Sequence, residues 1–208
     1  MKSKSVLVTG FGPFAGHAVN ASWQSVQLLP DEVNGIAIIK KEIPVEYVYV
    51  ESEIPQLWKE HSPMLVVHVG VSSEATNLTI EKCANREGYN KCDGAGLIHP
   101  SGLACTNGND CIFTEIDIEA VQNSVNSSGK VQSCISDDAG RYLCEFIYYT
   151  SLNVDPARTL FVHVPPLGLP YSAQELSEGL LEIIKCALEQ LTHQKDKYES
   201  AVANTCVC

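Results

Sequence analysis

Short runs of β-branched and apolar residues alternate along this chain with longer segments in which apolar residues recur every three or four positions. That alternation is typical of α/β proteins, whose helices pack on the faces of a largely parallel sheet. Several of the short runs are almost wholly apolar, as strands that are covered on both faces must be. The pattern therefore predicts the α/β fold class, with a twisted, mostly parallel central sheet flanked by helices on both faces.

The expected strands occupy 5–9, 35–43, 64–70, 76–82, 130–136 and 158–164, and the expected helices 21–29, 46–60, 116–126, 139–151 and 172–193. Pro55 lies inside the second helix, where it predicts a kink or a break. Between about residues 84 and 111 the chain is rich in Gly, Asn, Asp and Cys, which predicts a long excursion of turns. We expect one domain over 1–195 and a disordered polar tail over 196–208 that ends in Cys-Val-Cys.

Charge and hydropathy exclude several classes of partner. The formal net charge of −11 repels polyanions, so nucleic acid is not an expected partner. The longest apolar stretch, 63–70, is far shorter than the roughly 20 residues that cross a bilayer, so we expect no membrane partner either. The first strand begins almost at Met1 with no signal segment before it, which predicts a cytoplasmic protein.

The cysteines point to reduced thiols. There are nine, an odd number with irregular spacing, in a chain too large to need disulfide bonds for stability. The group Cys83, Cys92, Cys105 and Cys111 matches none of the usual zinc-ligand spacings, so we expect free thiols and no metal there.

A Gly/Pro-rich turn follows the first expected strand, at the place where open α/β sheets bind ligands. Gly10 and Gly12 are followed by Pro13 and Phe14, so the turn lacks the G-x-G-x-x-G pattern of a dinucleotide site. Phe11 and Phe14 would suit an apolar slot for a small flat group. Simple core packing of both rings is the alternative.

Three other residues suit nucleophilic catalysis, which needs a nucleophile, a base and a group that orients the base. Cys144 lies early in a helical segment after a strand, where the helix dipole favours a thiolate, although a buried structural cysteine would look the same. His163 ends an apolar strand just before two prolines, and Glu81 ends another strand that we expect to reach the same sheet edge. A solvated carboxylate is the alternative for Glu81, and mid-strand His68 is interpreted as a core histidine.

The segments that hold these residues are Val8–Phe14 with Asn20–Trp23, Leu65–Val71, Ile80–Cys83, Ser136–Cys144 and Phe161–Gly168. In these segments the sequence resembles pyroglutamyl-peptidase I, a family of cytosolic cysteine peptidases, and particularly its vertebrate form. The resemblance runs from about Ser5 to Leu191. Between 88 and 111 it is weakest, and Arg86 has no assured counterpart in the family.

The resemblance implies a nucleophile at Cys144, a base at His163 and an acidic triad member at Glu81. It also implies that Phe11 and Phe14 form the walls of a pyroglutamate pocket, with Asn20 as a supporting polar residue. The expected substrates are small peptides with an N-terminal pyroglutamate, cleaved through a thioester acyl-enzyme by a monomer without metal or organic cofactor. Two alternatives are a binding protein that has lost turnover and a thiol hydrolase with another acyl group, such as a glutaminase.

Overall fold

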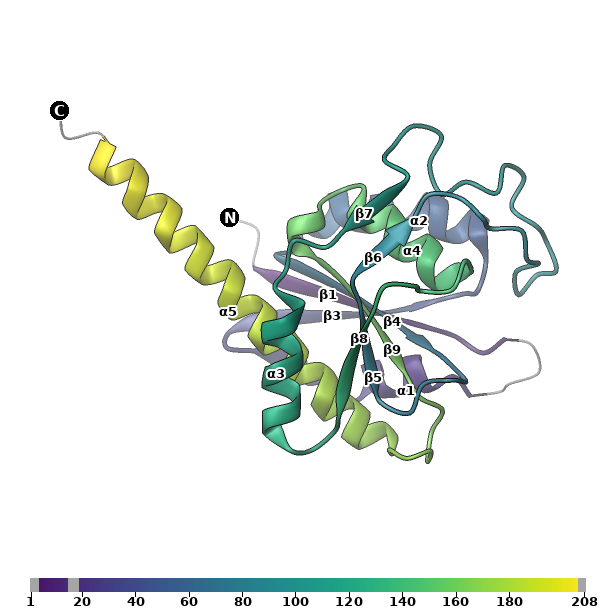
Figure 1. Ribbon diagram of the computed structural model, residues 1–208, viewed down its shortest axis with the longest axis horizontal. Helices are drawn as coiled ribbons and strands as arrows, with labels where there is room; N and C mark the ends of the chain where they lie inside the picture. Colours follow the sequence, from purple (N-terminus) through teal and green to yellow (C-terminus); the bar gives the residue numbers. More distant parts are fainter. Residues whose placement is uncertain (1–3, 15–18, 206–208) are drawn as a thin grey trace.

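The computed structural model describes the backbone of residues 4–14 and 19–205, and the side chains of that part as far as His193. Seven strands form one sheet in the order β2-β3-β1-β4-β9-β5-β8 (Figure 1). The strands of this sheet are β1 Ser5–Phe11, β2 Glu32–Val33, β3 Ile36–Ile43, β4 Leu65–Val71, β5 Leu78–Glu81, β8 Ser133–Ser136 and β9 Thr159–Val164. Strands β3, β1, β4 and β9 are mutually parallel, whereas β5 runs antiparallel to β9.

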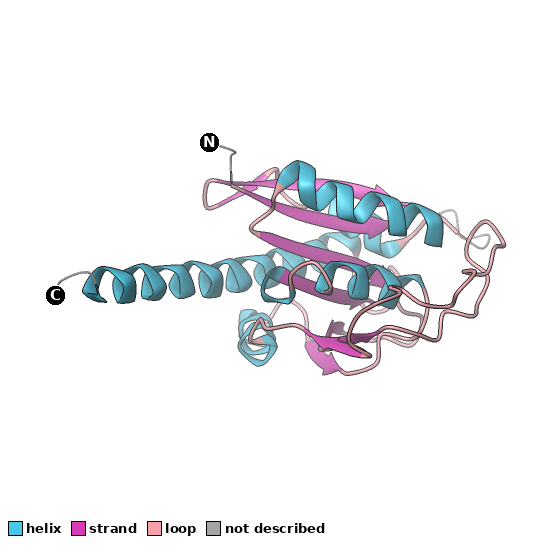
Figure 2. Ribbon diagram, turned by 90° about the horizontal axis from the view of Figure 1, so that it is seen from above, coloured by secondary structure: helices cyan, strands magenta, loops and turns pink. Residues whose placement is uncertain are grey.

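Helices lie on both sides of this sheet, as Figure 2 shows. They are α1 Ala21–Gln27, α2 Tyr47–His61, α3 Ile118–Ser128, α4 Leu143–Leu152 and α5 Ala173–Thr205, with a single 3₁₀ turn, η1, at Pro156–Arg158. The expected fold class is therefore confirmed. Among the described residues no helix is both long enough and apolar enough to span a bilayer.

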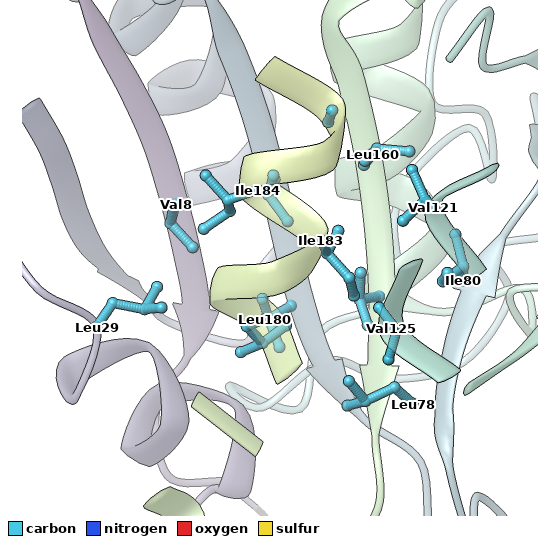
Figure 3. Packing of buried hydrophobic residues seen from close by; sticks show 14 of the residues in the cluster. Val8, Leu29, Leu78, Ile80, Val121, Val125, Leu160, Leu180, Ile183 and Ile184 are labelled. Carbon is cyan, nitrogen blue, oxygen red and sulfur yellow. The ribbon is translucent and has the colours of Figure 1, made fainter. Parts of the chain in front are cut away.

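Strand side chains alternate between two hydrophobic cores, because successive residues of a strand point to opposite faces. On β9, Leu160 and Val162 belong to the core beneath α1, α3 and α5, where Leu180, Ile183 and Ile184 of α5 lie over the sheet (Figure 3). Phe161 belongs to the opposite core, beneath α2 and α4. His163 shares the face of Phe161, so β9 presents it to α4.

Six of the sheet strands are those that the sequence predicts, and the differences lie elsewhere. Of the kink or break expected at Pro55, the break is absent, since α2 continues through it and buries Ile54, Leu57 and Trp58. Packing of these side chains outweighs the roughly 3 kcal/mol cost of a helical proline. Helix α4 begins at Leu143 rather than at 139, because Gly140 and Arg141 have φ values of 97° and 51° that no α-helix accepts.

The C-terminal helix also differs from expectation. The predicted disorder begins at 196, but the described backbone continues α5 to Thr205 and away from the body of the protein (Figure 1). Residues 194–204 contain neither glycine nor proline, so nothing in the local sequence ends the helix there. Residues 206–208, with the Cys-Val-Cys end, lie outside the described part.

The excursion between residues 84 and 111 is more ordered than the sequence predicts. Its two ends form an antiparallel ribbon of β6 Cys83–Asn85 and β7 Cys111–Phe113. Between them, Tyr89 and His99 are buried against Phe146 of α4, with ring centroids 5.0 and 5.1 Å away. The excursion therefore packs on the helix that carries Cys144.

Candidate active site

Helix α4 and strand β9 bring Cys144 and His163 together. Cys144 is the second residue of α4, and its partly exposed thiol lies next to the imidazole of His163. Gly70 of β4 lies directly beneath both groups. A Cβ atom at Gly70 would lie 2.6 Å from the Cys144 sulfur and 3.5 Å from Cδ2 of His163. The missing side chain at residue 70 is thus what leaves room for the pair.

Glu81 completes the group from β5, although not by the geometry that the sequence predicts. The sequence predicts that Glu81 and His163 emerge at one sheet edge, but β5 and β9 are antiparallel and pair Thr79 with His163. Glu81 is the diagonal neighbour of His163 on the same face, a separation that a long side chain spans. Its Oε1 lies 2.7 Å from Nδ1 of His163, and its Oε2 is buried without a partner among the described residues.

The charge state of His163 is set by competing effects. Burial acts to lower its pKa, but the Cys144 sulfur and the Glu81 carboxylate outweigh burial and raise the pKa to about 10. Since a hydrogen bond to Glu81 occupies Nδ1, the other ring nitrogen is directed toward Cys144. The arrangement therefore favours an imidazolium at His163 at neutral pH, next to the Cys144 sulfur.

A cleft of about 530 Å³ opens over these three residues. The other residues that line it are Val71, Ser72, Ser73, Glu74, Ala75, Thr79, Ser136, Asp138, Ala139, Gly140 and Tyr142. Most of these are polar or small, so the cleft offers room for an extended, solvated chain.

A smaller and more apolar recess of about 50 Å³ leads off at Cys144. Its lining consists of Phe11, Phe14, Asn20, Val45, Val71, Tyr142, Leu143 and Cys144. Both phenylalanines line this recess, and both also pack with the core beneath α2 and α4. None of the lining residues is an acid or a base apart from the thiol and the phenol.

Asn20 shapes this recess by holding the turn after β1. Its side chain caps α1 by accepting from the Ser22 N–H at 3.1 Å and donates to the Gly12 carbonyl at 3.0 Å. The Ser22 hydroxyl in turn accepts from the Phe11 N–H at 2.9 Å. Asn20 therefore fixes the backbone on which Phe11 and Phe14 stand.

His68 is a satisfied core histidine, as the sequence predicts. Its two ring nitrogens lie 2.7 Å from the hydroxyls of Thr9 and Ser151, and Ser151 also accepts from the Trp58 indole. Complete burial lowers the pKa of His68 to about 3. The residue stays neutral in the sheet and faces neither the cleft nor the recess.

Neither Arg86 nor the cysteine group contributes to the cleft. Arg86 forms an ion pair with Asp110 at 2.7 Å and does not line the cleft or the recess. Over the part of the chain with described side chains, no three His, Cys, Asp or Glu residues are placed to hold a metal ion. All seven cysteines of that part are free thiols.

Sequence reasoning missed two groups that surround the nucleophile. Gly70 is the last residue but one of the block 65–71, where a glycine within a valine-rich strand was the available signal. Arg141 and Glu145 form an ion pair of 2.8 Å on either side of Cys144. Their spacing of four residues, in a segment that is otherwise mostly apolar, was a detectable signal for a helix-end pair.

Residues 4–178 match the pyroglutamyl peptidase family. The chain belongs to this family. Pyroglutamyl-peptidase 1 of Homo sapiens is 48% identical over 197 residues, which cover 93% of this chain and 94% of the human protein. Pyrrolidone-carboxylate peptidase of Thermococcus onnurineus is 32% identical over 166 residues and covers 77% of this chain, with 82% of its own length matched.

Solved structures of the pyroglutamyl peptidase family share the fold. A mutant pyrrolidone carboxyl peptidase from Pyrococcus furiosus superposes with a TM-score of 0.83 at 24% identity, over 90% of this chain and 99% of that one. The pyrrolidone carboxyl peptidase of Thermus thermophilus gives a TM-score of 0.79 at 25% identity, over 86% and 98% of the two chains. The match extends over nearly the whole of both relatives.

Proposed function

We propose that this family member is a cysteine peptidase that removes the N-terminal pyroglutamyl residue from peptides. The observation that carries the proposal is the apolar recess that ends at Cys144, at the point where the adjoining cleft holds His163 and Glu81. The human relative is named pyroglutamyl-peptidase 1, in agreement with this chemistry.

The recess suits a lactam ring because its described lining contains no carboxylate. A pyroglutamyl residue has no free amine, so an acidic residue that grips an ammonium group would have no use here. Phe11 and Phe14 cover the ring faces, while backbone groups around the recess pair with the lactam N–H and carbonyl. A prolyl ring would leave those groups unpaired, at a cost of about 1 to 3 kcal/mol each.

The reaction begins when the Cys144 sulfur attacks the carbonyl carbon of the pyroglutamyl residue. The carbonyl electron pair moves to oxygen, and the N–H groups in the first turn of α4 can stabilise that oxyanion, since Tyr142 provides no side-chain cap there. One such donor is worth roughly 3 to 4 kcal/mol in other enzymes.

His163 then transfers its proton to the leaving amine as the C–N bond breaks, and the shortened peptide departs along the cleft. The product on the enzyme is a thioester. Water attacks it, His163 takes the water proton, and free pyroglutamate and the thiolate result. Throughout, Glu81 holds Nδ1–H of His163 and so keeps Nε2 directed at the sulfur.

The cleft beyond the recess suits small peptides, because its serines and threonine can pair with a peptide backbone. We further propose that the protein works in a reducing compartment such as the cytoplasm, where the Cys144 thiol stays active. The free thiols at the described cysteines support that assignment.

The test is release of a fluorophore from a pyroglutamyl amide under reducing conditions, with the matching prolyl and glutaminyl amides as controls. We expect the wild type to cleave only the pyroglutamyl amide, and Cys144→Ala to cleave none. Cys134→Ala, which changes an exposed thiol on β8, should retain full activity. Release of ammonia from glutamine would favour a glutaminase. Tight pyroglutamate binding without turnover would instead favour a binding protein.

A further inference from the structure

Glu145 follows the nucleophile directly, and its carboxylate is completely buried. It accepts hydrogen bonds from the backbone N–H and the side-chain amide of Asn85, at 2.9 and 2.8 Å. It also accepts from the backbone N–H and the guanidinium of Arg141, both at 2.8 Å. One carboxylate thus joins strand β6, the turn before α4 and the first turn of α4.

Arg141 occupies the strained part of this turn. Its φ of 51° lies in the left-handed region, which side chains other than glycine rarely adopt, so something must hold it there. Its guanidinium binds Glu145 and also Asp138, at 2.9 Å. Asp138 and Tyr142, on either side of Arg141, both line the cleft.

The ion pair between Arg141 and Glu145 also balances charge next to the nucleophile. A bare carboxylate at Glu145 would repel a thiolate at Cys144, in a place where burial weakens solvent screening. The guanidinium of Arg141 neutralises that carboxylate, so the first turn of α4 keeps its favourable field for an anion. Breaking such a buried pair on one side leaves an uncompensated charge.

We propose that Arg141 and Glu145 are a positioning pair that fixes Cys144 and the N–H groups of the first α4 turn against His163. Neither residue touches the reacting atoms. The inference rests on the proposed function for its turnover measurements, but it has a second readout that needs no substrate. That readout is the rate at which iodoacetamide alkylates Cys144, followed by mass spectrometry of the peptide that contains it.

The first variant is Glu145→Gln, which keeps the shape and removes the charge. We expect kcat to fall about 10- to 100-fold with little change in KM, since displacement of reacting groups acts on the chemical step. Alkylation of Cys144 should also slow, because displacement of the sulfur from His163 outweighs the loss of the neighbouring negative charge.

The second variant is Arg141→Gly, which removes the guanidinium but suits the left-handed backbone. Its kcat and alkylation rate should also fall, and Arg141→Lys should recover part of the loss by restoring the cation. The double variant should lose less than the product of the two single losses, because the residues act as a unit. If Glu145→Gln does not fold, Arg141→Gly decides the question.

Asp155→Asn is the matched control, since it breaks the 2.6 Å ion pair between Asp155 and Arg158 away from the cleft. It should lower the melting temperature without changing kcat or alkylation. The proposal is overturned if folded Glu145→Gln or Arg141→Gly keeps kcat and alkylation within about two-fold of the wild type. A wild type without turnover would refute the proposed function, whereas the alkylation rates would still test the pair.

Discussion

Gly70 of β4 has no room for a larger residue. A Cβ atom there would lie 2.6 Å from the Cys144 sulfur and 2.8 Å from Cζ of Phe161, so one of the two must move. A shift of the nucleophile by about 1 Å can cost about 100-fold in rate. We therefore expect Gly70→Ala to lower kcat by about 10- to 100-fold, measured with the pyroglutamyl amide.

Gly179 of α5 provides a control with equal crowding. Its Cβ would lie 2.5 Å from Val131 and 2.6 Å from Leu78, in the core on the opposite face of the sheet. Gly179→Ala should destabilise the fold by about 1 to 3 kcal/mol and leave kcat of the folded enzyme unchanged. If Gly70→Ala and Gly179→Ala lowered kcat equally, the effect of Gly70→Ala would come from lost stability and not from displacement of Cys144.

Glu81→Gln tests how the carboxylate acts on His163. The 2.7 Å contact raises the pKa of His163, so removing the charge should lower that pKa from about 10. We expect kcat to fall about 100- to 10,000-fold with little change in KM. The alkaline limb of the kcat/KM profile should move to lower pH, because the imidazolium then loses its proton earlier.

The control for that measurement is Glu119→Gln, an exposed carboxylate in the first turn of α3. It should leave both the rate and the pH profile as they are. A Glu81→Gln enzyme whose defect lay wholly in KM would assign Glu81 to substrate binding instead.

At the scale of elements, the residue that caps the short helix α1 also holds the turn that lines the recess. Asn20→Ala removes the cap and the bond to the Gly12 carbonyl, at a cost of about 0.5 to 2 kcal/mol. Because Phe11 and Phe14 stand on that turn, we expect kcat/KM for the pyroglutamyl amide to fall about ten-fold, mainly through KM.

Asn126→Ala is the comparison, since Asn126 likewise bonds backbone groups, those of Ser133, at 2.7 and 3.2 Å. It should cost similar stability and leave KM unchanged. An equal rise in KM in both variants would mean that Asn20 does not act on substrate binding through the recess.

The strands were predictable where a strand is long, apolar and flanked by turns, as β1, β4 and β9 are. Periodicity also located α2, α3 and α5, because each buries one face, whereas α4 is buried on nearly all sides. Periodicity failed for β6 and β7, which have three residues each and are held by pairing with one another. Such pairing is a long-range property that local sequence does not carry.

That three of the candidate site residues come together was predictable, but their geometry was not. Motifs located Cys144, His163 and Glu81, yet the contact between the last two depends on an antiparallel register that no local pattern specifies. Sequence alone also could not reveal that Gly70 lies under the sulfur, since β4 and α4 are far apart in the chain.

Over the whole molecule, two buried histidines have opposite effects on how the free energy of unfolding depends on pH. The pKa of His68 is lowered to about 3 by burial alone, whereas that of His163 is raised to about 10. A lowered pKa gives stability that is present above the unfolded value of about 6.5 and lost as the pH falls toward 3. The raised pKa of His163 gives stability that is present below about 6.5 and lost as the pH rises through about 10.

Urea unfolding across the acid range can isolate the part due to His68 by comparing the wild type with His68→Gln. We expect the wild type to be the more stable at neutral pH, since the variant disturbs the contacts with Thr9 and Ser151. Below about pH 6.5 the wild-type advantage should shrink by up to about 1.4 kcal/mol per pH unit, because only the wild type must bury a group that would otherwise bind a proton. An advantage that stayed constant between about pH 7 and pH 4 would mean that His68 does not govern the acid limit, and carboxylates paired in the native state would then have to explain it.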